Sequence, residues 1–144
     1  MAIRVRVRLT TKRSNRSSES TALVNSGYEA DEPEVVIPEK LAERLRFLPE
    51  LPPGTRLEEY ESVLGKARFH YLPKALKVAV LTADRKEGPI TCDVAIAPGE
   101  HEVLLSDKLI DALNLVPERP GVGFWRFRDE PPTKTRKSVV PEKW

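Results

Sequence analysis

Apolar and basic residues alternate near the start of the chain, which reads Ile3-Arg4-Val5-Arg6-Val7-Arg8-Leu9. A period of two places successive side chains on opposite faces of a sheet, so residues 3–10 are predicted to form a strand with one apolar face. The arginines are interpreted as the solvated face of that strand. A nucleic-acid surface is the alternative, although no aromatic residue is interleaved there to stack on bases.

Other apolar runs predict further strands, separated by polar or glycine-containing turns. They cover residues 21–24, 35–37, 76–81, 90–96, 103–105 and 123–127. A weaker pattern over residues 56–71 predicts a hairpin that turns near Gly65. Residues 12–20 are expected to be a polar connection between the first two strands.

Two short helices are predicted from apolar residues at helical spacing. The first opens at Pro38, carries Leu41, Leu45 and Leu48 on its apolar side, and stops before Pro49. The second is capped by Ser106 or Asp107, directs Leu109, Ile110 and Leu113 inward, and ends at Asn114. The fold class is therefore mainly β with two short helices.

The chain also contains an internal repeat. Residues 36–47 and 104–115 match in register at their apolar, acidic and capping positions, and each passes from an apolar strand into a helix. The turn Asn25-Ser26-Gly27 precedes the first stretch, and Ala97-Pro98-Gly99 precedes the second. This matching predicts a fold built from two similar halves.

Composition indicates an ordinary globular protein of one domain, over residues 1–127, followed by a Pro- and Lys-rich tail over residues 128–144. The tail is expected to be mobile, with Trp144 docking on another surface. No apolar run approaches the roughly 20 residues of a membrane helix, and no secretory signal is present, so a cytoplasmic location is expected. The absence of glutamine and the abundance of Glu, Lys and Arg suggest a thermophilic source.

The single cysteine and the two histidines suggest no catalytic set. Cys92 cannot form an internal disulfide and is interpreted as a small buried residue. His70 and His101 lack a nucleophile or a second histidine at a recognised spacing. The acidic loop 28–34 is interpreted as solvated rather than as a calcium site. No cofactor or metal is expected.

Three stretches carry a resemblance to a known family: Ala22-Leu23-Val24-Asn25-Ser26-Gly27, residues 36–45, and Val103-Leu104-Leu105 before the second helix. They resemble the retropepsin-like aspartic proteases, whose motif reads apolar-apolar-Asp-Thr/Ser-Gly. The resemblance implies a small closed β-barrel that works as a homodimer, with one catalytic loop per subunit beneath a hairpin flap. It places Asn25, Ser26 and Gly27 at the catalytic motif.

The sequence departs from that family at the residue that matters most. Asn25 stands where the catalytic aspartate would be, Ser106 replaces a glycine before the second helix, and loop 28–34 is longer than usual. Aspartic proteolysis needs two facing carboxylates that share a proton, and an amide cannot exchange a proton near neutral pH. The prediction is a non-catalytic homodimer that binds extended peptides.

Two alternative functions remain open at the level of the sequence. The first is an active peptidase that uses another carboxylate, with Asp31, Asp93 and Asp107 as candidates, or that regains an aspartate by deamidation of Asn25. The second is association with nucleic acid through the basic N-terminal residues and the basic tail, whose binding would weaken steeply with salt.

Overall fold

The computed structural model describes residues 2–25, 27–62 and 65–144. The described residues form the following elements: β1 Arg4–Thr11, β2 Ser17–Val24, β3 Glu34–Ile37, α1 Glu39–Arg44, β4 Arg56–Ser62, β5 Gly65–Leu81, β6 Lys86–Ile96, β7 Val103–Leu105, α2 Asp107–Ala112, β8 Leu115–Arg119, β9 Phe124–Phe127 and β10 Arg136–Lys137.

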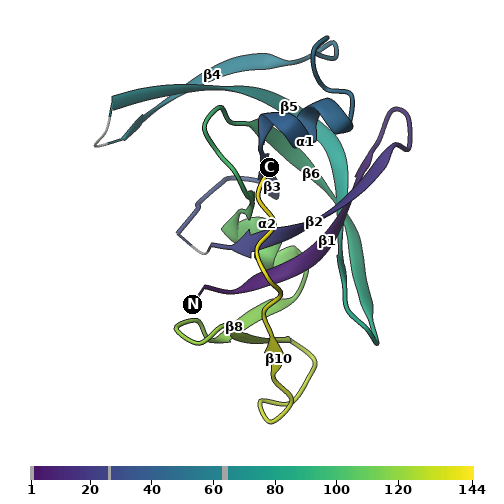
Figure 1. Cartoon of the computed structure of the whole chain (residues 1–144), viewed down its shortest axis with the longest axis vertical. Helices are drawn as coiled ribbons and strands as arrows, with labels where there is room; N and C mark the ends of the chain where they lie inside the picture. The colour runs from purple at the N-terminus through teal and green to yellow at the C-terminus, as the bar shows by residue number, and fades with distance from the viewer. Residues whose placement is uncertain (1, 26, 63–64) are drawn as a thin grey trace.

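Six of the strands close into a barrel (Figure 1). They follow the order β1-β2-β7-β3-β6-β5, and β5 pairs back onto β1. Closure removes the free edges of the sheet, so the backbone donors and acceptors of these strands find partners around the ring. The predicted mainly β fold class, with a closed barrel and two short helices, is confirmed.

The interior of the barrel is filled by the apolar residues that the alternation singled out. Ile3, directly before β1, and Val5, Val7 and Leu9 of β1 are at most 2% exposed. Their polar neighbours on the outer face form ion pairs: Arg6 and Arg8 both contact Glu19 of β2 at 3.1 Å. The alternation of apolar and basic residues therefore correctly predicted a half-buried strand whose outer face is charged.

The same scheme of strand pairing occurs twice in the barrel. The antiparallel pair β1–β2 corresponds to β5–β6, and the parallel pair β2–β7 corresponds to β6–β3. The antiparallel pairs β3–β7 and β1–β5 join the two sets.

The two helices end in the same way. The residue two positions after each helix has a left-handed backbone, with φ 65° at Arg46 and φ 57° at Asn114. The first helix begins after Pro38, which is its N-cap residue rather than its first turn, and it is shorter than predicted. The helix ends at Arg44, four residues before Leu48, because the left-handed backbone of Arg46 turns the chain away from the helix axis.

Several strands are longer than the sequence predicts, or were not predicted at all. Strand β2 begins at Ser17, within the expected polar connection, because a ladder needs backbone partners and tolerates polar side chains on its outer face. The strands β8 and β10 were not anticipated; β8 contains Pro117, which is tolerated where its missing N–H is not needed. The hairpin predicted over residues 56–71 is formed by β4 and the first part of β5.

A second, three-stranded sheet of β8, β9 and β10 lies next to the barrel (Figure 1). Its apolar residues pack on the barrel core, and ion pairs join the two as well. Arg136 contacts the buried Glu130 at 2.5 Å and Asp84 of the β5–β6 turn at 2.8 Å. Arg85 of the same turn contacts Asp129 at 2.7 Å and lies over the Phe127 ring. Since Glu130 is only 8% exposed, its charge depends on these arginines.

The C-terminal residues differ from the expectation of a mobile tail. They cross the barrel as a strap, defined here as residues 138–144, which runs over β1 and β2 in Figure 1. The Val139 N–H donates to the Arg4 carbonyl at 3.0 Å, and the Glu142 N–H donates to Thr21 Oγ1 at 2.7 Å. The strap therefore adds backbone contacts to two barrel strands.

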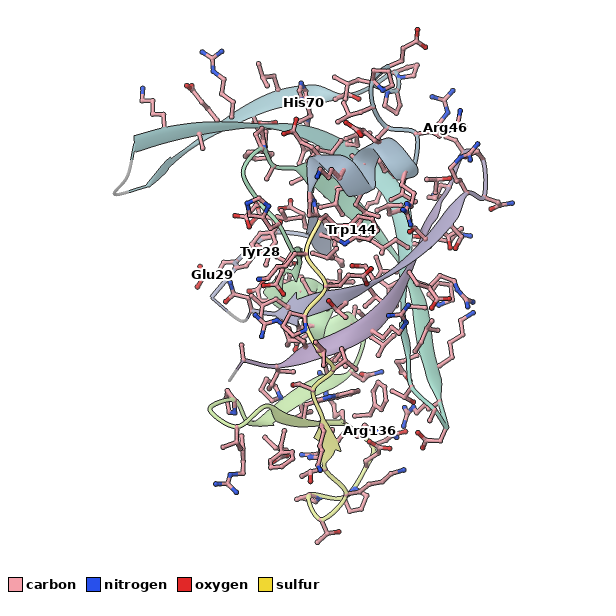
Figure 2. The ribbon with its side chains drawn as sticks, viewed as in Figure 1. Tyr28, Glu29, Arg46, His70, Arg136 and Trp144 are labelled. Carbon is pink, nitrogen blue, oxygen red and sulfur yellow. The ribbon has the colours of Figure 1, made fainter. Side chains whose placement is uncertain are left out.

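Trp144 docks on the barrel, as the sequence suggested (Figure 2). Its indole Nε1–H donates to Ser20 Oγ at 2.9 Å, and its backbone N–H donates to the His101 carbonyl at 2.8 Å. The Arg44 guanidinium lies 5.1 Å from its ring centroid. The terminal residue thus joins β2, α1 and the loop before β7.

Among the described residues, no helix is long and apolar enough to cross a membrane.

We expect Trp144→Ala to lower the free energy of unfolding by about 1–3 kcal/mol, because it removes a half-buried aromatic ring and one hydrogen bond. Urea denaturation followed by far-UV circular dichroism measures the change. Val140→Ala is the matched control, because that side chain is 82% exposed in the same strap and its truncation should change stability by less than about 0.5 kcal/mol. Equal effects of the two substitutions would contradict the docking of Trp144.

Candidate functional site

The turn after β2 carries the residues that the sequence singled out. Asn25 follows the last residue of β2 and is exposed, and its Oδ1 accepts the N–H of Gly27 at 3.2 Å. The Tyr28 N–H donates to the Asn25 carbonyl at 3.0 Å, which closes the turn. Ser26 lies outside the described residues. The asparagine side chain therefore has a defined local role as the acceptor of the turn.

Gly27 allows this arrangement because it has no side chain. A Cβ atom at residue 27 would lie 3.3 Å from Asn25 Oδ1, which is tighter than an ordinary van der Waals contact. The equivalent turn after β6 is closed in the same way, by the Glu100 N–H and the Ala97 carbonyl at 3.3 Å. The two turns thus occupy matching places after β2 and β6, and only the first offers a polar side chain at its start.

Loop 28–34 is fastened to the start of α2. Ser106 is the N-cap of that helix: its Oγ accepts the Leu109 N–H at 3.2 Å and also the Glu34 N–H at 3.0 Å. Asp107 Oδ1 accepts the Ala30 N–H at 3.2 Å. Of the two candidate caps, Ser106 performs the capping, and Asp107 instead holds the loop.

Glu34 corrects the interpretation of loop 28–34 as solvated throughout. Glu29, Asp31 and Glu32 are exposed, but the Glu34 side chain is half-buried and accepts the hydroxyl of Tyr28. Burial, and then the nearby negative charge of Asp93, raise the pKa of Glu34 to about 7. A carboxyl group with this pKa is largely protonated in mildly acidic solution.

Asp93, one of the three alternative catalytic carboxylates, is buried, but both of its carboxylate oxygen atoms already accept hydrogen bonds. It is 3% exposed; Oδ1 accepts the Lys74 N–H at 2.9 Å and Oδ2 accepts the Tyr71 hydroxyl. Lys74 lies in the bulge where the β5–β6 register shifts between Leu72 and Leu76. Asp93 therefore replaces a missing ladder partner and secures the bulge.

The pairing of Glu34 with Asp93 was missed at the level of the sequence. The two residues face each other in the parallel β3–β6 ladder. Glu34 was assigned to an acidic loop because three exposed acids precede it in the sequence. The only available signal was its place directly before the apolar run 35–37, which can extend a strand backwards by one residue.

The remaining candidates are structural or isolated. Cys92 is buried, as predicted, and burial raises the pKa of its thiol well above the ordinary value. His101 Nδ1 lies 3.2 Å from the Trp144 carbonyl oxygen, and His70 lies on the β4–β5 hairpin (Figure 2). Asp31 is exposed in its loop, and no described side chain joins it to Asp93 or Asp107.

The basic residues of the N-terminal strand are engaged by acids. Arg4 donates two hydrogen bonds to the Glu102 carboxylate, at 2.7 and 3.1 Å, while Arg6 and Arg8 share Glu19. Cations that already neutralise a carboxylate are less available for phosphate groups. This supports the solvated-face interpretation of the strand.

Comparisons with known proteins give no independent identification. No protein-family model matches the sequence, and no significant match was found among curated proteins.

The Glu34 site predicts a specific dependence of stability on pH. Because folding raises the Glu34 pKa from its ordinary 4.5 to about 7, the folded state binds the proton more tightly. The resulting stabilisation is complete below pH 4.5 and is lost as the pH rises to about 7. The shift sets an upper bound of about 3 kcal/mol, which solvent screening of a half-buried group reduces to about 1–2 kcal/mol.

Glu34→Gln tests this assignment, because the amide keeps an oxygen acceptor for Tyr28 but carries no charge. Urea denaturation of both proteins between pH 4.5 and 8 should show the variant gaining about 1–2 kcal/mol over the parent protein as the pH rises. Glu29→Gln, on an exposed carboxylate of the same loop, serves as the control. A stability difference between parent and Glu34→Gln that stayed constant over this pH range would contradict the assignment.

Proposed function

We propose that this protein is a catalytically inactive relative of the retropepsin-like aspartic proteases, and that it binds extended peptides as a homodimer. The observation that carries the proposal is Asn25, placed on an exposed turn at the end of an apolar barrel strand. In the family that the sequence resembles, this is the position of the catalytic aspartate.

The architecture around the turn supports the proposal. The barrel has six strands, and its two sets of strand pairings match each other, as expected for a protein made of two similar halves. The β4–β5 hairpin projects from the barrel on the side where loop 28–34 also lies (Figure 1). A projecting hairpin on the side of the catalytic-type loop is the arrangement that the resemblance implies.

The chemistry of Asn25 supports the loss of proteolysis. The reaction requires one ionised carboxylate, which takes a proton from water, and one protonated carboxyl group, which polarises the peptide carbonyl. An amide is isosteric with a carboxylate but accepts no proton near neutral pH. Two such side chains facing each other across a dimer axis would hydrogen-bond and would leave the attacking water without a base.

Peptide binding is supported by the free edge of the hairpin. In the described part of the sheet, β4 pairs with β5 alone and stands last in the strand order. An edge strand presents unpaired N–H and C=O groups that an extended peptide can join by strand addition. The exposed Leu57 side chain, at 59%, offers an apolar contact on this strand.

Asn25→Asp is the decisive substitution. If the fold is retained and only the carboxylate is missing, the variant should cleave unfolded polypeptides in the acid range, with a bell-shaped pH profile from two coupled carboxyl groups. Its rate should exceed that of the parent protein by at least about 10²-fold, the lower end of what a general base contributes. Mass spectrometry of the peptide products provides the measurement.

Asn25→Ala is the control and should be inactive. Cleavage by the parent protein that a pepstatin-type inhibitor stops would overturn the proposal in favour of an active peptidase. Intact-mass analysis separates the deamidation route, since a one-dalton gain at residue 25 would have to accompany such activity. Failure of a folded Asn25→Asp dimer to cleave any substrate would also count against the proposal.

The homodimer is tested separately by light scattering. One catalytic-type turn per chain needs a second copy to form a two-turn groove, so a particle of twice the chain mass of 16.3 kDa is expected. A monomer at micromolar concentration would contradict the dimeric part of the proposal. Unchanged mass in Asn25→Ala would show that the turn side chain does not hold the dimer together.

A further inference from the structure

A pocket of about 630 Å³ opens at the opposite end of β2 from the Asn25 turn. Three segments surround it: the β1–β2 turn, the chain that follows α1 as far as Gly54, and the bulge of β5. Figure 2 shows Arg46, which follows α1, facing the β1–β2 turn at this place. The volume falls within the range of about 300–1,000 Å³ that is usual for small-molecule sites.

The floor and one wall of the pocket are apolar. Phe47 and Leu72 line it and are 5% and 3% exposed, so they belong to the core and form a rigid base. Leu51 lines the wall and is 37% exposed, which makes it one of the exposed large hydrophobic side chains of the protein. A bound molecule with an apolar body would cover this side chain and gain the free energy of its burial.

The rim of the pocket is strongly basic. Its lining includes one carboxylate, that of Glu50, and five cationic residues. The cationic residues are Lys12, Arg13, Arg16, Arg46 and Lys74. Lys74 has a carboxylate of Glu32 at 3.6 Å. For the other four, no carboxylate of the described residues lies within ion-pair distance. Cations gathered around a concave apolar surface raise the local concentration of anions.

The segments that carry these cations have defined backbones. The Arg16 N–H donates to Thr11 Oγ1 at 3.0 Å, and the same oxygen bonds the Ser14 hydroxyl at 2.8 Å, so the β1–β2 turn is internally braced. Arg46 keeps a charged side chain at φ 65°, where glycine would be less strained. The same left-handed conformation follows the second helix at Asn114, so it sets the direction of the chain at the pocket rim.

We propose that this pocket binds a small organic anion in which a carboxylate, sulfonate or phosphate group is attached to an apolar body. The apolar body occupies the floor formed by Phe47 and Leu72 and covers Leu51. The anionic group lies at the rim, where Arg13, Arg16 and Arg46 donate hydrogen bonds to it. The site is separate from the Asn25 turn, and the proposal does not depend on the function assigned to that turn.

The test uses 1-anilinonaphthalene-8-sulfonate, an anionic group on an apolar ring system, titrated into the folded protein at low salt and followed by its fluorescence. Saturable binding at one site per chain is expected. N-phenyl-1-naphthylamine, the analogue without the sulfonate, should bind at least tenfold more weakly. Equally tight binding of this neutral analogue would overturn the proposal.

The triple variant Arg13→Gln, Arg16→Gln, Arg46→Gly should weaken binding of the sulfonate by at least tenfold, because it removes three rim charges at positions that tolerate the new residues. The matched control is Lys86→Gln, Lys108→Gln, Arg119→Gln, which changes the net charge equally at exposed positions outside the pocket lining. It should bind within twofold of the parent protein.

Two further results would overturn the proposal: a triple variant that binds within twofold of the parent, or a control variant that loses as much affinity as the triple variant. Thermal unfolding of each variant establishes that it is folded. Leu51→Ser adds a second readout, because it should weaken binding of both dyes while leaving the rim charges intact. Unchanged affinity in Leu51→Ser would show that the dye does not lie against the apolar wall.

Discussion

Closure of the barrel depends on β5, which belongs both to the closed ring of strands and to the projecting β4–β5 hairpin. Its C-terminal part pairs with both β1 and β6, and its N-terminal part pairs with β4 in the hairpin and with the end of β6. A strand of this length can do so only if it bends, and the register shift between Leu72 and Leu76 supplies the bend. Bulges disrupt the ladder locally and leave backbone groups in need of partners. Asp93 provides one from the neighbouring strand, which explains why a carboxylate is retained inside a barrel wall.

The same bend connects the two regions for which a function is proposed here. On one side of it, the hairpin of β4 and β5 projects from the barrel, and on the other side the bulge forms part of the basic pocket. The ion pair between Lys74 and Glu32 links the bulge to loop 28–34. The bulge therefore contacts both loop 28–34 and the pocket.

Much of the fold follows from local patterns, and the exceptions have physical causes. Strict alternation in residues 3–9 identified a barrel strand, and the matching stretches at 36–47 and 104–115 identified two helices with equivalent ends. The pattern of apolar residues did not predict β8 or the start of β2. These segments are held by backbone hydrogen bonds, and their polar and apolar side chains do not alternate regularly. The strap over residues 138–144 shows neither strand alternation nor helical spacing. It is ordered by contacts with strands more than 100 positions earlier, which no local pattern contains.

The candidate site shows the same division. Asn25 and Gly27 could be singled out from the sequence, because their spacing after an apolar strand is local. The pairing of Glu34 with Asp93, and the gathering of Lys12, Arg13, Arg16, Arg46 and Lys74 around one pocket, arise from the folded topology alone. Charges that are scattered along the chain become a cluster only when the β1–β2 turn, the end of α1 and the β5 bulge meet.

The strap also determines how the molecule would respond to mechanical load. Both backbone groups of Arg4 are bonded to it, the N–H to Ser138 Oγ and the carbonyl to the Val139 N–H. A force pulling the two ends of the chain apart would first peel the strap from its free end, one hydrogen bond at a time. At the other end of the chain the same force acts on β1, which is paired with both β2 and β5, so two ladders must break before this strand leaves the barrel.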